Sequence, residues 1–191
     1  MIYLVTKVKA LFKSSKYECI SIERSKEIIN YKKKIRGLDT ETMGLNPHTK
    51  ALLTVQIGTK ENQVVIDCTT INIWEYKNIL EDSNILYILA NAKFDIQFFF
   101  KHNIILSKIW DVMLAEKIRY LGYPKNSFHA DLKTLEYKYL NKYMDKTVRG
   151  KITKVGLTEE VIVYAANDVV DLEDLMNAQI KALEKEDLVK A

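Results

Sequence analysis

The chain has 191 residues, of which 48% are hydrophobic and 28% are charged, a balance that predicts one globular domain with a substantial core. A formal net charge of +4 suits a polyanionic partner, but many proteins of this charge bind none, so charge alone excludes little. No apolar run approaches the ~20 residues needed to span a bilayer, and we therefore expect a soluble protein without a membrane partner.

Two segments rich in β-formers open the chain, residues 2–8 and 17–22. The polar stretch between them predicts an extra N-terminal strand pair or hairpin. A short helix is expected over residues 23–34, and it ends in a basic run, Lys32 to Lys34. Such a run is typical of a solvated helix end, with a phosphate-contacting patch as the alternative.

A three-strand meander is predicted next. Residues 35–40 form its first strand, a turn follows at Gly44 and Pro47, and residues 52–58 and 63–67 form the second and third strands. An acidic pair lies at the end of the first strand, so we expect this pair to sit near the centre of the sheet.

A strand-to-helix unit is expected after the meander. Residues 74–80 predict a helix, residues 85–90 a strand, and residues 93–102 an amphipathic helix. The last of these carries consecutive aromatic residues that we expect in the core rather than in a base-stacking platform: Phe98, Phe99 and Phe100.

The remainder of the chain has a helical pattern, with helices predicted at residues 112–121, 132–140 and 158 to about 186. Asp111 and Asp131 precede the first two and are interpreted as their caps. Early strands with a crossover helix, followed by helices, predict an α/β fold. Its mixed sheet combines the meander with parallel strands and is flanked by helices on both faces.

Three short motifs carry acidic groups. Asp39 and Glu41 lie two apart on a predicted strand, so their side chains leave the same face. Asp95 follows the strand-to-helix junction, and Tyr164 and Asp168 lie four apart on one helix face. Each motif alone is weak, because a chance Asp-x-Glu or a solvated Asp is common. Together they predict two hard metal ions, Mg²⁺ or Mn²⁺, held by carboxylates in a nuclease.

These motifs resemble the DEDD (DnaQ-like) superfamily of 3′-5′ exonucleases, in its tyrosine-bearing (DEDDy) subgroup. That subgroup contains the proofreading domain of family A DNA polymerases and ribonuclease D. The matching segments are 37–42 through Leu45, Asn91 to Asp95 and Tyr164 to Asp168, with 110–115 and 131–135 similar to intervening helices. The histidine subgroup carries His where this chain has Val163. The resemblance covers residues 35–182, which we take as the core of one exonuclease domain with a ribonuclease H-like sheet, residues 1–191, preceded by an extension, residues 1–34.

The resemblance also implies roles for individual residues. Its metal ligands would be Asp39, Glu41 and Asp168 on the first ion, with Asp39 bridging to a second ion that Asp95 reaches through water. Its substrate contacts would be Thr40, Thr42, Leu45, Asn91 and Phe94. Leu45 would wedge against the terminal base, and Phe94 lacks the hydroxyl that many relatives carry there. Tyr164, a phenol that is ordinarily neutral at pH 7, would orient the attacking water.

The implied activity is a two-metal-ion 3′-5′ exonuclease that releases nucleoside 5′-monophosphates from single-stranded or frayed DNA. DNA is favoured over RNA because the first two motifs look closer to the proofreading type. A ribonuclease D-like exoribonuclease is the alternative. We expect the enzyme to be freestanding or to work with a polymerase supplied in trans.

Two other functional classes remain as alternatives. A catalytically inactive nucleic-acid-binding module on the same fold need not keep the metal ligands, all of which are present here. A phosphatase or nucleotidyl hydrolase acting on free nucleotides is the second.

Other reactive residues are given ordinary roles. Cys19 and Cys68 show no CxxC pair and follow no secretory signal, which predicts reduced thiols and a cytoplasmic location. The histidines show no metal-ligand spacing and are expected at the surface or as caps: His48, His102 and His129. Candidate phosphate contacts are Lys93, Lys101, Lys133, Arg149 and Lys151.

Overall fold

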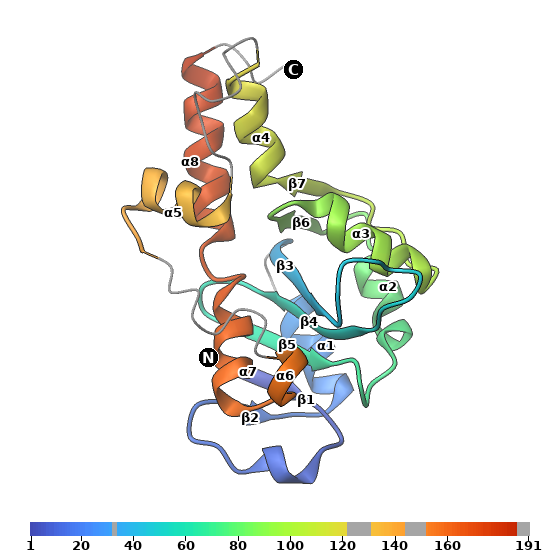
Figure 1. Cartoon of the computed structure of the whole chain (residues 1–191). Helices are drawn as coiled ribbons and strands as arrows, with labels where there is room; N and C mark the ends of the chain where they lie inside the picture. The colour runs from blue at the N-terminus through green and yellow to red at the C-terminus, as the bar shows by residue number, and fades with distance from the viewer. Residues whose placement is uncertain (32–33, 122–130, 144–151, 187–191) are drawn as a thin grey trace.

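A computed structural model describes residues 1–31, 34–121, 131–143 and 152–186 of the chain (Figure 1). The strands in this part are β1 (Ile2–Val5), β2 (Glu18–Cys19), β3 (Ile35–Thr42), β4 (Leu52–Gly58), β5 (Gln63–Asp67), β6 (Leu86–Leu89) and β7 (Ile109–Asp111). They form one mixed sheet in the order β2-β1-β5-β4-β3-β6-β7. This sheet confirms the predicted α/β fold class.

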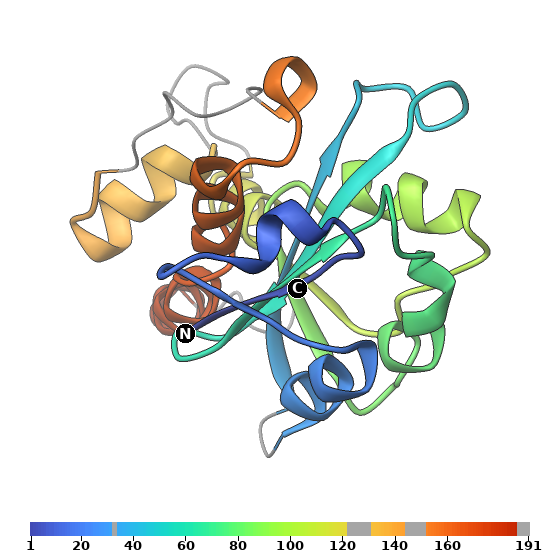
Figure 2. The same ribbon diagram turned by 90° about the horizontal axis from the view of Figure 1, so that it is seen from below.

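Helices cover both faces of the sheet. They are α1 (Ile22–Asn30), α2 (Lys77–Leu80), α3 (Ala92–Lys101), α4 (Val112–Arg119), α5 (Leu132–Leu140), α6 (Ile152–Val155), α7 (Glu159–Asn167) and α8 (Leu172–Lys185), with 3₁₀ turns η1 (Lys9–Phe12) and η2 (Ile73–Tyr76). Figures 1 and 2 place α7 and α8 on one side of the sheet and α1, α2 and α3 on the other. None of the described helices is long and apolar enough to cross a membrane.

The predicted meander is confirmed. β3 pairs with β4 and β4 with β5, both antiparallel, and every residue of β4 and β5 is buried because helices cover both faces. β6 pairs with β3 in parallel, as a crossover connection requires. The acidic pair therefore lies on β3, which is a central strand with a partner on each side.

The first strands pair differently from a hairpin. β1 runs parallel to both β2 and β5, so the predicted strand pair is present but the hairpin alternative is wrong. Residues 6–17, which include η1, carry the chain back to the start of β1 before β2 begins. A connection of this length permits a parallel pair, whereas two strands joined by a tight turn must be antiparallel.

Two elements differ from the helical pattern predicted for the second half. β7 is a three-residue strand that pairs in parallel with β6, and so short a strand shows no alternation that a sequence could reveal. The single helix predicted to run from residue 158 to about 186 is wrong. It is divided into α7 and α8 by a turn at residues 168–171.

Each face of the sheet has its own core. Leu38, Val55 and Ile57 pack with aromatic side chains of η2 and α3 on one face, while Ile88 and Val169 pack with α4, α5 and α8 on the other. Phe98 and Phe99 are fully buried, as predicted, and burial of each such ring stabilises the fold by roughly 1.5–3 kcal/mol. Phe100 is 68% exposed, so its predicted place in the core is wrong. It lies on the solvent face of α3, about 200° around the helix from Phe98 and about 100° from Phe99.

Candidate active site

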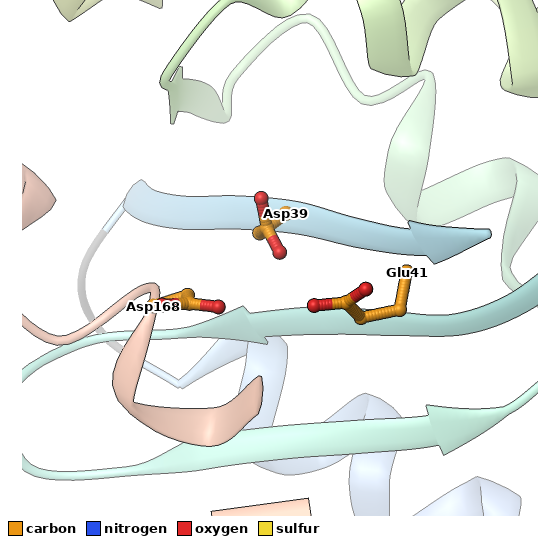
Figure 3. A group of neighbouring side chains, drawn as sticks. All are labelled: Asp39, Glu41 and Asp168. Carbon is orange, nitrogen blue, oxygen red and sulfur yellow. The ribbon is translucent and has the colours of Figure 1, made fainter. Parts of the chain in front are cut away.

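Three carboxylates from two distant segments meet on one face of the sheet. Asp39 and Glu41 project from β3, and Asp168 lies at the C-terminal cap of α7. One oxygen from each carboxylate lies within 4.8 Å of the other two, and Figure 3 shows the groups directed toward a common point. Within the described residues, this is the group of acidic, His and Cys side chains that has metal-ligand geometry.

The turn after α7 seats Asp168 against β3. Thr158 caps the start of α7 by accepting a hydrogen bond from the Val161 amide, and the Asp168 amide closes the last turn on the Ala165 carbonyl. Val169, the next residue, is buried against Gly37 of β3. The backbone of the turn can approach the strand this closely because Gly37 has no Cβ.

We predict that Gly37→Ala disturbs the site more than its stability cost suggests. An added Cβ would lie 2.5 Å from the Val169 carbonyl oxygen, so the α7–α8 turn would have to move, and Asp168 with it. We expect about 10-fold to 100-fold lower kcat and weaker Mn²⁺ binding by calorimetry, with roughly 1–3 kcal/mol lost from the free energy of unfolding.

Gly58→Ala is the matched control for that substitution. Gly58 is the register partner of Gly37 on β4, and its added Cβ would meet the Asn62 carbonyl at 2.6 Å, away from the carboxylates. It should therefore lose similar stability while it keeps its affinity for Mn²⁺. Equal Mn²⁺ affinities in the two variants would show that Gly37 does not position Asp168.

Asp95 lies beside the three carboxylates without joining them. Its side chain is 2% exposed, and its Oδ1 accepts a hydrogen bond of 2.6 Å from the Thr40 hydroxyl. Thr40 is one residue from Asp39 on β3 and so leaves the opposite face of the strand. Asp95 is thereby fixed at the edge of the same site, outside the group of three carboxylates.

Every residue that the sequence assigned to the site lines one cavity of about 410 Å³: Asp39, Thr40, Glu41, Thr42, Leu45, Asn91, Phe94, Asp95, Tyr164 and Asp168. The cavity also contacts Met113, Asp131 and Leu132, which were predicted as helix residues or, for Asp131, as a helix cap, and not as part of the site. The sequence feature that could have identified these three residues is the similarity of segments 110–115 and 131–135 to intervening helices of the family. Leu45 is 84% exposed at the rim, where an apolar side chain is available to a base.

Asp111 holds the start of α3, and α3 forms one wall of the cavity. It caps α4, as predicted, by accepting hydrogen bonds from the Met113 and Leu114 amides. The same carboxylate accepts from the amides of Asn91 and Ala92 at the start of α3. Asn91 has a left-handed backbone (φ 67°) and makes no side-chain cap of its own, so Asp111 supplies the cap for both helices.

The electrostatics of the site favour cations. Burial first, and then the charges of Asp168, Asp95 and Glu41, raise the pKa of Asp39 well above its usual range. Burial raises the pKa of Asp95 to about 7, against the opposing hydrogen bond from Thr40. Crowded carboxylate oxygens of this kind are hard ligands that suit Mg²⁺ or Mn²⁺, and the residues present fit such ions.

The predicted cap, histidines and basic residues are not among the three clustered carboxylates. Asp131 caps α5, as predicted, through the Thr134 amide. Neither His48 nor His102 belongs to the metal-ligand group of the described residues. Lys93, Lys101 and Lys133 are exposed on α3 and α5. The other assignments fall outside the described residues: Lys32, Lys33, His129, Arg149 and Lys151.

Known proteins share both the sequence pattern and the fold. A family model described as 3′-5′ exonuclease matches residues 19–184. DNA polymerase I of Aquifex aeolicus is 32% identical over 140 residues, which make up 72% of this chain and 22% of the polymerase. The chain thus spans less than a quarter of the length of that relative.

Solved structures extend the similarity to the whole chain. Brucella melitensis NrnC bound to pGG is 22% identical, with a TM-score of 0.75 over 100% of this chain and 85% of that one. Escherichia coli RNase D, described as an exoribonuclease involved in structured RNA processing, is 20% identical, with a TM-score of 0.73 over 97% of this chain and 46% of that one. At these identities the similarity shows the ribonuclease H-like exonuclease fold.

Proposed function

Because this chain belongs to the 3′-5′ exonuclease family, we propose that it is a metal-dependent 3′-5′ exonuclease of the tyrosine-bearing subgroup that acts on single-stranded or frayed DNA. The observation that carries the proposal is the convergence of Asp39, Glu41 and Asp168 within 4.8 Å. Tyr164 in the same cavity, with Val163 where the other subgroup has His, supports the subtype. We take residues 1–191 as one exonuclease domain.

The carboxylates would hold two divalent ions, Mg²⁺ or Mn²⁺. We assign the first ion to Asp39, Glu41 and Asp168, and the second to Asp39 together with Asp95 acting through water. When bound, the two ions would supply the attacking hydroxide and stabilise charge at the phosphorus and the leaving 3′ oxygen. The protein contributes the rigid placement of these ligands on a central strand and on the cap of α7.

The other cavity residues would orient the substrate. Leu45 and Phe94 offer apolar surface to the terminal base, and Asn91 offers an amide at the start of α3. The Thr42 hydroxyl donates to the Gly44 carbonyl at 2.9 Å, which shapes the turn that carries Leu45. A cavity of about 410 Å³ is of the size that small-molecule sites have, and it suits one nucleotide at a time.

DNA is the substrate that we propose, with a nucleoside 5′-monophosphate as the product. The relative that is 32% identical is a DNA polymerase, and this similarity supports proofreading with a polymerase supplied in trans. Exoribonuclease activity is the second candidate, since the solved structures of similar fold include an exoribonuclease.

One set of digestions tests these proposals. Matched 5′-labelled DNA and RNA strands, single-stranded or with paired and mismatched 3′ ends, are incubated with Mg²⁺ and with Mn²⁺. We expect ladders that shorten one nucleotide at a time from the 3′ end, fastest on single-stranded or mismatched DNA. Faster loss of RNA would favour the second candidate. Binding of Mn²⁺ and strands without cleavage would indicate an inactive module.

Tyr164→Phe should give a slower enzyme with an intact site. We assign to the phenol the orientation of the attacking water, so its loss should lower kcat by about 10-fold to 100-fold and leave KM and Mn²⁺ affinity unchanged. Single-turnover rates on a 5′-labelled single strand measure the effect. Tyr137→Phe, a change of the same kind on the exposed side of α5, is the control. A wild-type rate for Tyr164→Phe would remove the phenol from the mechanism.

A further inference from the structure

One exposed face of α3 leads away from the catalytic cavity. Lys93, Gln97, Phe100 and Lys101 fall within about 100° of one another around the helix axis, and all four are exposed. The Gln97 amide donates to the Lys93 carbonyl at 2.9 Å, which holds its side chain along the helix. We call these four residues the α3 stripe.

Helix α3 begins at the cavity, and the α3 stripe ends beside the β3–β4 loop. Asn91 and Phe94, at the start of α3, line the cavity. At the other end, the Lys101 ammonium donates to the Lys50 carbonyl at 3.1 Å, in the β3–β4 loop that lies beside α3 in Figures 1 and 2. The Lys50 stem packs against Gly44, which also lines the cavity.

Three lysines lie on this side of the site: Lys50, Lys93 and Lys101. No ion pair within the described residues involves Lys50, Lys93 or Lys101. A single strand approaching here would therefore meet uncompensated positive charge. Such charge is the main source of affinity for a phosphate backbone.

The charged side chains differ on the opposite side of the site. A second cavity adjoins the first at Tyr164 and Asp168, and the other charged residues that line it within the described part of the chain are Lys16, Lys142, Glu136, Glu160 and Asp171. Both lysines are already paired, Lys16 with Glu159 and Lys142 with Asp171. Among the described residues of this second cavity the carboxylates outnumber the lysines, so their charges favour phosphates less than those along α3 do.

We propose that the α3 stripe and Lys50 bind the single strand upstream of its 3′ end, an inference that rests on the proposed exonuclease function. The three lysines contact phosphates, and the ring of Phe100, which is 68% exposed, stacks on a base. From Lys93 to Lys101 the helix rises about 12 Å. A dinucleotide has a single internucleotide phosphate, so when it is held in the cavity it does not span the three lysines.

The test compares a 12-nucleotide strand with a dinucleotide. In the triple variant Lys50→Gln, Lys93→Gln, Lys101→Gln, we expect kcat/KM on the 12-mer to fall at least about tenfold at 50 mM KCl. The slope of log(kcat/KM) against log[KCl] should shrink by about 2, since each phosphate contact on a single strand contributes about 0.7. Dinucleotide hydrolysis should be unchanged. Phe100→Ala should lower kcat/KM on the 12-mer about tenfold and keep the slope.

Matched controls make the outcome decisive. Exposed lysines on other elements supply a variant of equal charge: Lys9→Gln, Lys117→Gln, Lys181→Gln. Phe12→Ala, on η1, is the control for Phe100. An unchanged slope in the first triple variant, equal losses on both substrates or equal losses in the controls would overturn the inference. If the wild type cleaves neither substrate, the proposed function fails, while the salt slope of 12-mer binding by fluorescence anisotropy still tests the α3 stripe.

Discussion

Asp168→Ala is expected to lower kcat by roughly 10³-fold to 10⁵-fold on a 5′-labelled single strand with Mg²⁺, and Asp39→Ala should have the same effect. The two carboxylates belong to the group whose oxygens lie within 4.8 Å of one another, and we propose both as ligands of the first ion. Calorimetry should show the loss of the tighter Mn²⁺ site in both variants. Thermal melts should show that the fold persists, because removing one of several crowded like charges relieves repulsion in the metal-free protein.

Asp174→Ala is the control for this prediction. Asp174 lies on α8, six residues after Asp168, where it pairs with Lys60 near the surface. Its loss should cost about 1 kcal/mol of stability at most and leave both kcat and Mn²⁺ binding as in the wild type. Activity of Asp168→Ala close to that of the control would contradict the assignment of the first ion.

Local periodicity explains why the sequence predicted most of the carboxylate site. Asp39 and Glu41 share a face because side chains alternate along a strand, and no tertiary information is needed. Tyr164 and Asp168 stay on one side of α7 because the helical spacing persists through the cap at Asp168. The convergence of the two segments, in contrast, was expected from the resemblance of the three motifs to the exonuclease family.

The features that were not predicted from the sequence depend on the tertiary structure. The helical pattern continues through residues 168–171, yet the chain turns there, and packing of Val169 on Gly37 is a contact across more than a hundred residues of chain. Asp111 was predicted to cap one helix and caps two, because its second set of donors comes from a segment about twenty residues earlier. Phe100 was assigned to the core from its aromatic neighbours, although its position on α3 faces solvent.

Asp95→Asn is expected to make the metal-free protein more stable at pH 8 and the enzyme far less active. The folded pKa of Asp95 is about 7, whereas an unfolded Asp titrates near 3.9. Between these values the folded state holds a proton that the unfolded state has lost, so the free energy of unfolding falls as pH rises from about 4 to about 7. At 1.36 kcal/mol per pKa unit, this amounts to at most about 4 kcal/mol. Because asparagine stays neutral, Asp95→Asn should not lose this free energy of unfolding as the pH rises.

Urea unfolding in EDTA at pH 5 and pH 8 measures the free energy of unfolding of the metal-free protein. The wild type should be less stable than Asp95→Asn by about 1.5 kcal/mol at pH 5 and by at most about 4 kcal/mol at pH 8. Asp174→Asn should follow the wild type at both. Mn²⁺ should stabilise the wild type more at pH 8 than at pH 5, because the ion competes with protons for the carboxylates. A wild type whose metal-free stability rises from pH 5 to pH 8 in step with Asp95→Asn would contradict the raised pKa.

The activity of Asp95→Asn tests whether the destabilising charge of Asp95 is needed for catalysis. Asp95 is buried and held by Thr40 at the edge of the site, where a neutral side chain would be cheaper for folding. If its charge serves the second ion, Asp95→Asn should lose about 100-fold or more in kcat while the tighter Mn²⁺ site, which rests on the other three carboxylates, stays measurable by calorimetry. A variant that is more stable at pH 8 and yet retains wild-type kcat would assign Asp95 to the structure of the site alone.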